Sequence, residues 1–135
     1  MPHCVILYTP NLETRTDVGL LCRKLADEML KIKDEAGKQV FPTGGTQVLA
    51  YPAAHYAVAD GEDDYAFMYL NIRMAGGRSA EVKQQAGDRL LQVVTDHFAP
   101  IFANELVGIT LQIDESPGQV YDGKHSNLHP LFNKA

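Results

Sequence analysis

The sequence predicts an α/β (α+β) fold in which two β-α-β repeats form a four-stranded sheet with two helices on one face. One observation is that a strand pattern, an amphipathic helix pattern and another strand pattern follow one another twice. Another is size, because 135 residues with 45% apolar content are enough for one domain with its own core. We therefore expect a single domain over residues 1–135, with repeats at about 2–51 and 64–114 and a C-terminal arm at about 115–135.

The first repeat begins with a strand at His3–Tyr8, where apolar and β-branched residues follow one another as in a buried strand. The apolar spacing then changes to three and four residues, which indicates an amphipathic helix. Its apolar stripe consists of Val18, Leu21, Cys22, Leu25, Met29 and Ile32. Asn11 or Thr14 would cap the start of this helix and Gly37 would stop it. A strand at 47–51, after the "FPTGG" turn, completes the repeat.

The second repeat follows a loop at 52–64 that is rich in breakers. Alternation over 65–74 predicts a strand with one apolar face. That face consists of Ala66, Met68, Leu70 and Ile72, and the opposite face of Tyr65, Phe67, Tyr69, Asn71 and Arg73. Ser79 is a suitable N-cap for the next helix. The stripe of that helix consists of Val82, Ala86, Leu90, Val94, His97 and Ile101, and a last strand follows at 106–113.

The sheet should have one face that its own helices leave open. Two helices can cover one side of four strands, yet the other side carries Tyr65, Phe67 and Tyr69 with few charges. Such a face is commonly buried by self-association. We therefore expect a homo-oligomer, with the aperiodic arm that begins near Ser116 packed on a neighbouring copy.

Charge and cysteine content restrict the class of protein. A net charge of −5 with scattered basic residues argues against a nucleic-acid partner or an anionic membrane surface. No apolar run approaches the roughly 20 residues of a membrane span. Cys4 and Cys22 lie in apolar surroundings without a preceding signal segment, so we expect reduced thiols in a cytoplasmic protein.

Few side chains suggest a metal or a phosphate. The five histidines form no metal-binding spacing with one another or with cysteine, and we expect no metal and no other cofactor. His97 lies on a helical stripe, which favours a hydrogen-bonded core or interface histidine. The acidic "DGEDD" segment lacks the spacing of a calcium loop and is read as a solvated turn. "GGRS" is too short for a phosphate loop, and its glycines instead shape a turn that aims Arg78.

The N-terminus is the most unusual chemical feature. Methionine is commonly removed before a small residue, so the mature chain is expected to begin with the secondary amine of Pro2 at the start of a buried strand. An α-amine has a pKa of about 7.7–8.0 in water, and burial or a nearby guanidinium lowers that pKa. A neutral amine held at this position can serve as a general base.

Four motifs extend across most of the chain: "MPH", "DYAFMYLNIRMAGGRSAEVKQQAG", "DHFA" and "SNLHPLF". Together they resemble the 5-carboxymethyl-2-hydroxymuconate Δ-isomerase family of the tautomerase superfamily. The resemblance implies a homotrimer of β-α-β repeats without cofactors. It also implies that the N-terminal proline moves a proton between carbons of a carboxylate-bearing muconate during homoprotocatechuate (4-hydroxyphenylacetate) breakdown.

The same resemblance assigns the site residues. Pro2 matches the catalytic base, and Arg78 matches an arginine that binds a carboxylate or stabilises a dienolate. A second family arginine corresponds here to Gln47, which can donate hydrogen bonds but brings no charge. Arg73 is a candidate replacement for that charge, and Phe41 is expected to form an apolar wall.

Two other functions remain open at this point. One is another tautomerase-type reaction on a smaller acid. The other is a non-catalytic trimer that binds a small acid, which the uncharged Gln47 makes plausible.

Overall fold

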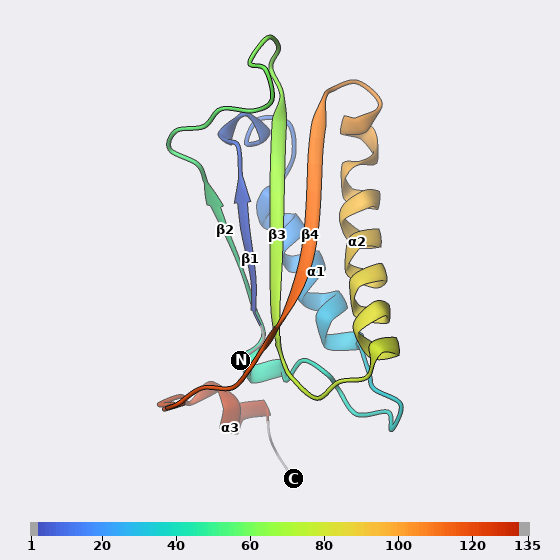
Figure 1. Ribbon diagram of the computed structural model, residues 1–135, viewed down its shortest axis with the longest axis vertical. Coiled ribbons are helices and arrows are strands. Elements are labelled where there is room, and N and C mark those ends of the chain that lie inside the picture. Colours follow the sequence, from blue (N-terminus) through green and yellow to red (C-terminus); the bar gives the residue numbers. More distant parts are fainter. Residues whose placement is uncertain (1–2, 133–135) are drawn as a thin grey trace.

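The computed structural model describes residues 3–132. They form a four-stranded sheet in the order β2-β1-β3-β4 with two long helices (Figure 1). The strands are β1 (His3–Tyr8), β2 (Gln47–Pro52), β3 (Ala66–Ala75) and β4 (Val107–Ser116). The helices are α1 (Val18–Lys31), α2 (Ala80–Phe102) and α3 (Leu128–Phe132), with short 3-10 turns η1 (Pro10–Leu12) and η2 (Thr43–Gly45).

The strand pairing confirms the two predicted repeats. β1 pairs in parallel with β2, and β3 pairs in parallel with β4, so each half is one β-α-β unit. The two units meet where β1 and β3 pair antiparallel at the centre of the sheet. In this register His3 lies beside both Gln47 and Arg73, so the start of β1 is placed next to the start of β2 and the end of β3.

The core lies between the sheet and the two long helices. Ala66, Met68, Leu70 and Ile72 of β3 are all at most 1% exposed, which confirms the predicted alternation. The prediction for α2 was wrong at one position, because Phe98 is fully buried and the neighbouring His97 is only partly buried. Its 23 residues of helix follow a period of 3.6, so the ring at 98 continues the stripe of Val94 better than the ring at 97 does.

The ends of the helices differ from the sequence prediction in the first repeat only. Asp17, rather than Asn11 or Thr14, caps α1 by accepting a hydrogen bond from the backbone N–H of Leu20 at 2.9 Å. Asn11 is instead part of η1, where its side chain donates to the carbonyl of Tyr65. α1 ends at Lys31, several residues before Gly37. In the second repeat, Ser79 caps α2 as predicted.

One face of the sheet is covered by none of the described helices. We call it the open face. Its apolar side chains include Leu7, Leu49, Tyr51 and Phe67, which are 37–51% exposed. Part of the C-terminal arm packs on its own chain, because α3 contacts η2. Residues 117–127 of the arm form neither helix nor strand.

Candidate active site

Two of the candidate site residues lie beside the start of β1. Gln47 and Arg73 flank His3 on the two neighbouring strands. Both are exposed, and both alternate with core residues, so they belong to the open face. Gln47 also borders a groove between α1, η2 and Phe132 of α3. Pro2, the assigned base, is bonded to His3 but lies outside the described residues.

A small cavity of about 200 Å³ lies just beyond this end of β1. Met74 and Ala75 line it, and they follow the residue of β3 that pairs with His3. Gly45 lines it from the turn that leads into β2. The complete lining consists of Val40, Pro42, Gly45, Met74, Ala75, Arg78, Lys124 and His129. The cavity is therefore adjacent to the position where the chain enters the sheet.

Arg78 reaches this cavity because of the turn between β3 and α2. Gly77, directly before it, has a φ of 94°, a conformation that side chains with a Cβ rarely adopt. The guanidinium donates to the carbonyl of Val40 at 3.3 Å and lies 3.5 Å from a carboxylate oxygen of Asp34. With its side chain 26% exposed, Arg78 is anchored on one side and accessible to an anion on the other.

Phe41 occupies a different place from the one expected. Its side chain is fully buried in the core and does not line the cavity. The residues on either side, Val40 and Pro42, form the apolar wall instead. Phe41 therefore lies behind the residues that line the cavity, because the "FP" turn directs the ring inward and its neighbours outward.

Sequence reasoning missed Lys124 and His129, which also line the cavity. Both lie in the arm, whose residues have no periodicity that would place them in the fold. The one available signal was the "SNLHPLF" motif, which contains His129. The cavity thus brings Arg78 together with a lysine and a histidine from the other end of the chain.

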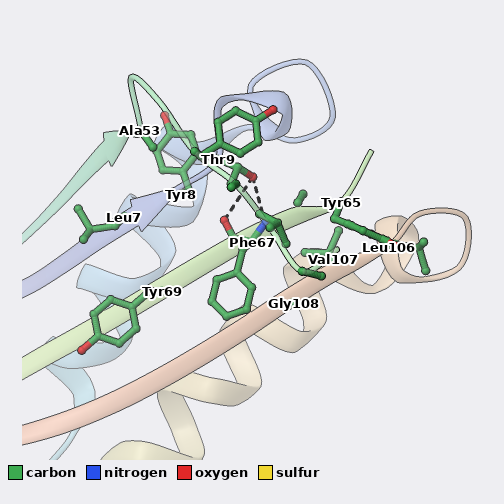
Figure 2. Close-up of a pocket in the computed structure, with 15 residues that line it drawn as sticks. Leu7, Tyr8, Thr9, Ala53, Tyr65, Phe67, Tyr69, Leu106, Val107 and Gly108 are labelled. Carbon is green, nitrogen blue, oxygen red and sulfur yellow. Dashed lines mark hydrogen bonds between the residues drawn. The ribbon is translucent and has the colours of Figure 1, made fainter. Parts of the chain in front are cut away.

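A larger cavity of about 670 Å³ lies on the open face at the opposite end of the sheet (Figure 2). It lies beside Tyr8 and Thr9, where β1 ends, and its lining contains no charged side chain. Thr9 fixes this region, because its hydroxyl accepts a hydrogen bond from the backbone N–H of Phe67 at 3.0 Å (Figure 2). The larger cavity is therefore less suited to an anion than the smaller one, because only the smaller of the two contains charged side chains.

The other candidate groups have structural explanations. Burial, with a smaller contribution from Cys22, raises the pKa of the Cys4 thiol to about 12, so Cys4 is a poor nucleophile. His97 hydrogen-bonds the Thr16 hydroxyl at 2.7 Å and Lys24 at 3.2 Å, which agrees with a satisfied histidine. Within residues 3–132, no group of three or more His, Cys, Asp or Glu side chains is arranged to hold a metal ion. No helix in this range has the length and hydropathy needed to cross a membrane.

Comparison with known proteins identifies the family. The model of the 5-carboxymethyl-2-hydroxymuconate isomerase family matches residues 2–132. The chain belongs to this family. It is 28% identical over 132 residues to a 5-carboxymethyl-2-hydroxymuconate Delta-isomerase from Escherichia coli, covering 98% of this chain and 99% of the relative. The chain is therefore an enzyme, an isomerase of the tautomerase superfamily.

Solved structures agree with this assignment. A crystal structure of a 5-carboxymethyl-2-hydroxymuconate delta-isomerase is 51% identical, with a TM-score of 0.93 over 100% of this chain and 95% of that one. An isomerase from Deinococcus radiodurans R1 is 35% identical, with a TM-score of 0.84 over 98% and 95% of the two chains. A fused 4-OT, described as a symmetric trimer, shares the fold at 20% identity and a TM-score of 0.51, over 86% and 85% of the two chains.

Proposed function

We propose that the chain isomerises 5-carboxymethyl-2-hydroxymuconate with the amine of Pro2 as the general base, in the breakdown of homoprotocatechuate. The observation that carries the proposal is the cavity at the start of β1, which contains Arg78. Pro2 is covalently joined to His3, and His3 lies in register with Gln47 and Arg73, of which Arg73 directly precedes the cavity-lining Met74. The amine of Pro2 and the guanidinium of Arg78 would thus both act on a substrate bound in this cavity.

The reaction needs a group that first removes and then returns a proton. The neutral amine of Pro2 takes the proton of the substrate's 2-hydroxyl group, and the electron pair left on that oxygen is shared with the conjugated chain as a dienolate. The resulting ammonium then delivers the proton to a carbon of the conjugated system, and the oxygen becomes the 2-oxo group. An amine with a pKa near the working pH suits both steps, since it is a competent base when neutral and a competent acid when protonated.

Arg78 would stabilise the negative charge of the substrate and of the dienolate. Its guanidinium is planar and can hold two carboxylate oxygens at once. Gln47 would contribute a neutral hydrogen bond at the edge of the site. Replacing a charged partner by a neutral one costs roughly 1.5–3 kcal/mol, or about ten- to over a hundredfold in binding or rate.

We also propose that the working enzyme is a homotrimer. The cavity of about 200 Å³ is smaller than the roughly 300–1,000 Å³ of typical ligand sites, so a neighbouring copy would supply the remaining wall. The open face exposes Leu7, Tyr51 and Phe67, which are side chains suited to an interface between copies. The fused 4-OT described as a symmetric trimer provides a precedent for this fold. We propose a cytoplasmic location because Cys4 and Cys22 are free thiols.

The base assignment is tested by Pro2→Ala beside the parent and Arg23→Ala. Arg23 is a matched control because it is exposed on α1 and, within residues 3–132, forms its ion pair with Asp27 one turn away. Intact mass must first establish that Met1 has been removed, since a retained methionine acylates the proline nitrogen. We expect Pro2→Ala to lose about 10²- to 10⁴-fold in kcat, with Arg23→Ala unchanged. Undiminished turnover in Pro2→Ala would show that the secondary amine of proline is not required as the base.

Gln47 is the one observation that favours a second activity. A site with less positive charge accepts an acid with fewer carboxylates more readily than the parent family's site would. A substrate panel at neutral pH, which compares the tricarboxylate with smaller dienols and 2-oxo acids, separates the two. A higher kcat/KM for a monocarboxylate than for the muconate would favour the second activity.

A further inference from the structure

The cavity beside Arg78 contains more positive charge than the family resemblance accounts for. Lys124 and His129, both from the C-terminal arm, line the same space of about 200 Å³. α3, which carries His129, lies at the same end of the sheet as the start of β1 (Figure 1). Two chain segments more than forty residues apart, the "GGRS" turn and the arm, therefore direct nitrogen-bearing side chains to one point.

His129 is held in place by close packing. A Cβ added to Gly44 would lie 2.9 Å from the Cα and 3.1 Å from the backbone nitrogen of His129, closer than real Cβ contacts. Only glycine at position 44 allows α3 to approach η2 this closely. The neighbouring Gly45 lines the cavity, so the contact fixes the histidine ring at the cavity rim.

Lys124 is available for a ligand. Its side chain is 44% exposed, and its ammonium contacts one carboxylate oxygen of Asp122 at 2.7 Å. An exposed ion pair of this kind is worth little in water, so a substrate carboxylate can replace Asp122 without much loss. Arg78, by contrast, is already partly neutralised by Asp34 at 3.5 Å.

The proposed substrate carries more negative charge than Arg78 alone can balance. 5-Carboxymethyl-2-hydroxymuconate has the two carboxylates of muconate and a third on its carboxymethyl branch. Gln47 brings no charge at the position of a family arginine. We propose that Lys124 and His129 form a second carboxylate-binding subsite, which takes the carboxylate of the carboxymethyl branch while Arg78 binds the muconate frame. This inference rests on the proposed function for the identity of the substrate.

The subsite is tested with Lys124→Ala and His129→Ala. The matched controls are His125→Ala, an exposed residue of the same arm that does not line the cavity, and Lys31→Ala in the last turn of α1. The substrates are 5-carboxymethyl-2-hydroxymuconate and 2-hydroxymuconate, which lacks the branch carboxylate. We expect each subsite variant to raise KM for the branched substrate about tenfold with kcat nearly unchanged, and to leave KM for 2-hydroxymuconate within about twofold.

A binding measurement separates this inference from the base assignment. Calorimetry with two unreactive ligands, 2-(carboxymethyl)adipate and adipate, needs no turnover and can also be done in Pro2→Ala. We expect Lys124→Ala and His129→Ala to weaken only the branched ligand, by about tenfold. Gly44→Ala should weaken it as well, because the added methyl displaces α3, whereas Gly87→Ala should not, since its Cβ would meet only Ile113 at an ordinary 3.6 Å.

The outcomes are distinct. Equal weakening of both ligands, no weakening of either, or the same loss in His125→Ala would overturn the subsite. Retained turnover in Pro2→Ala with selective loss of the branched ligand in Lys124→Ala would instead overturn the base assignment and leave the subsite standing.

Discussion

The two ends of the sheet are built from the same strands but differ in chemistry. At the start of β1, a cavity of about 200 Å³ contains Arg78, Lys124 and His129. At the end of β1, a cavity of about 670 Å³ is lined by aromatic and aliphatic side chains without a charge (Figure 2). The larger and more apolar cavity is suited to contact with another copy of the chain. The smaller one is suited to an anion.

The difference arises from the segments that adjoin the strands at each end. The charged end receives two irregular segments, the turn at Gly77 and the arm, and each can direct a long polar side chain without disturbing the sheet. The apolar end is bordered by the loop at 53–65, whose acidic residues face solvent while Tyr56, Ala57 and Val58 face the cavity. We therefore expect the catalytic side chains at the end of the sheet where the turn at Gly77 and the arm lie beside the start of β1.

The largest effect should come from removing the cation at the charged end. Arg78→Ala should lower kcat/KM for the muconate by about 10²- to 10³-fold, because it removes a charged donor from the developing dienolate. Arg78→Lys should recover only part of this loss, since an ammonium cannot make the two parallel hydrogen bonds of a guanidinium. Steady-state kinetics with Lys83→Ala, a surface lysine paired with Glu115, provide the control. An Arg78→Ala enzyme with parental kcat/KM would contradict the role of this end.

A charge introduced in the apolar part of the open face should disrupt association between copies of the chain. Leu7 is 49% exposed and lines the larger cavity, so Leu7→Asp should convert the proposed trimer to a monomer because a carboxylate cannot be buried there unpaired. Leu20→Asp is the matched control, because Leu20 is 47% exposed on α1, outside the sheet. Light scattering after size exclusion measures the mass of each. A Leu7→Asp protein that stays trimeric would show that the open face is not the interface.

Restoring a charge at position 47 should have a smaller effect, in the opposite direction. Gln47→Arg places a guanidinium beside His3 and should raise kcat/KM for the tricarboxylate by up to about tenfold. Gln47→Glu should lower it, since the carboxylate repels the substrate. Unchanged kinetics in both variants would remove Gln47 from the substrate site.

The smallest predicted effect is on the pH dependence of stability and involves His97 of α2, which lines neither of the two cavities. Burial, and secondarily the charge of Lys24, lower its pKa below the ordinary 6.5. The unfolded chain then binds a proton more readily than the folded one, so stability falls as pH drops through about 6.5 toward the lower folded-state pKa. His97→Gln should reduce the fall in Tm between pH 7.5 and pH 5.5 by roughly 2 °C and leave the pH dependence of kcat unchanged. An identical fall in Tm in parent and variant would contradict this assignment.

The regular part of the fold was predictable from the sequence because its signals are local. The alternation of Met68, Leu70 and Ile72 indicated both the β3 strand and its buried face, and Ser79 indicated the start of α2. The N-cap of α1 was not found, because Asn11, Thr14 and Asp17 all have suitable side chains. Asn11 instead donates to the carbonyl of Tyr65, a contact between distant parts of the sequence, and Asp17 caps the helix.

The site was only partly predictable, for a related reason. Arg78 could be placed because its turn lies between two clearly patterned elements. Phe41 was expected as an apolar wall, and its ring is buried behind the cavity lining. The irregular segment that carries it gives no indication of which side chain points inward. Lys124 and His129 reach the cavity through a contact at Gly44 that connects distant parts of the sequence, and no local pattern encodes such a contact.

The proposed base is a neutral N-terminal amine at the charged end of the sheet. The most direct measurement is an NMR titration of the protein with ¹⁵N-labelled proline, after intact mass has established that Met1 is absent. We predict that the pKa of the Pro2 amine lies below the ordinary range of about 7.7–8.0 and rises in Arg78→Ala, because the guanidinium disfavours a second positive charge. A Pro2 pKa at or above that range, unchanged in Arg78→Ala, would contradict the account.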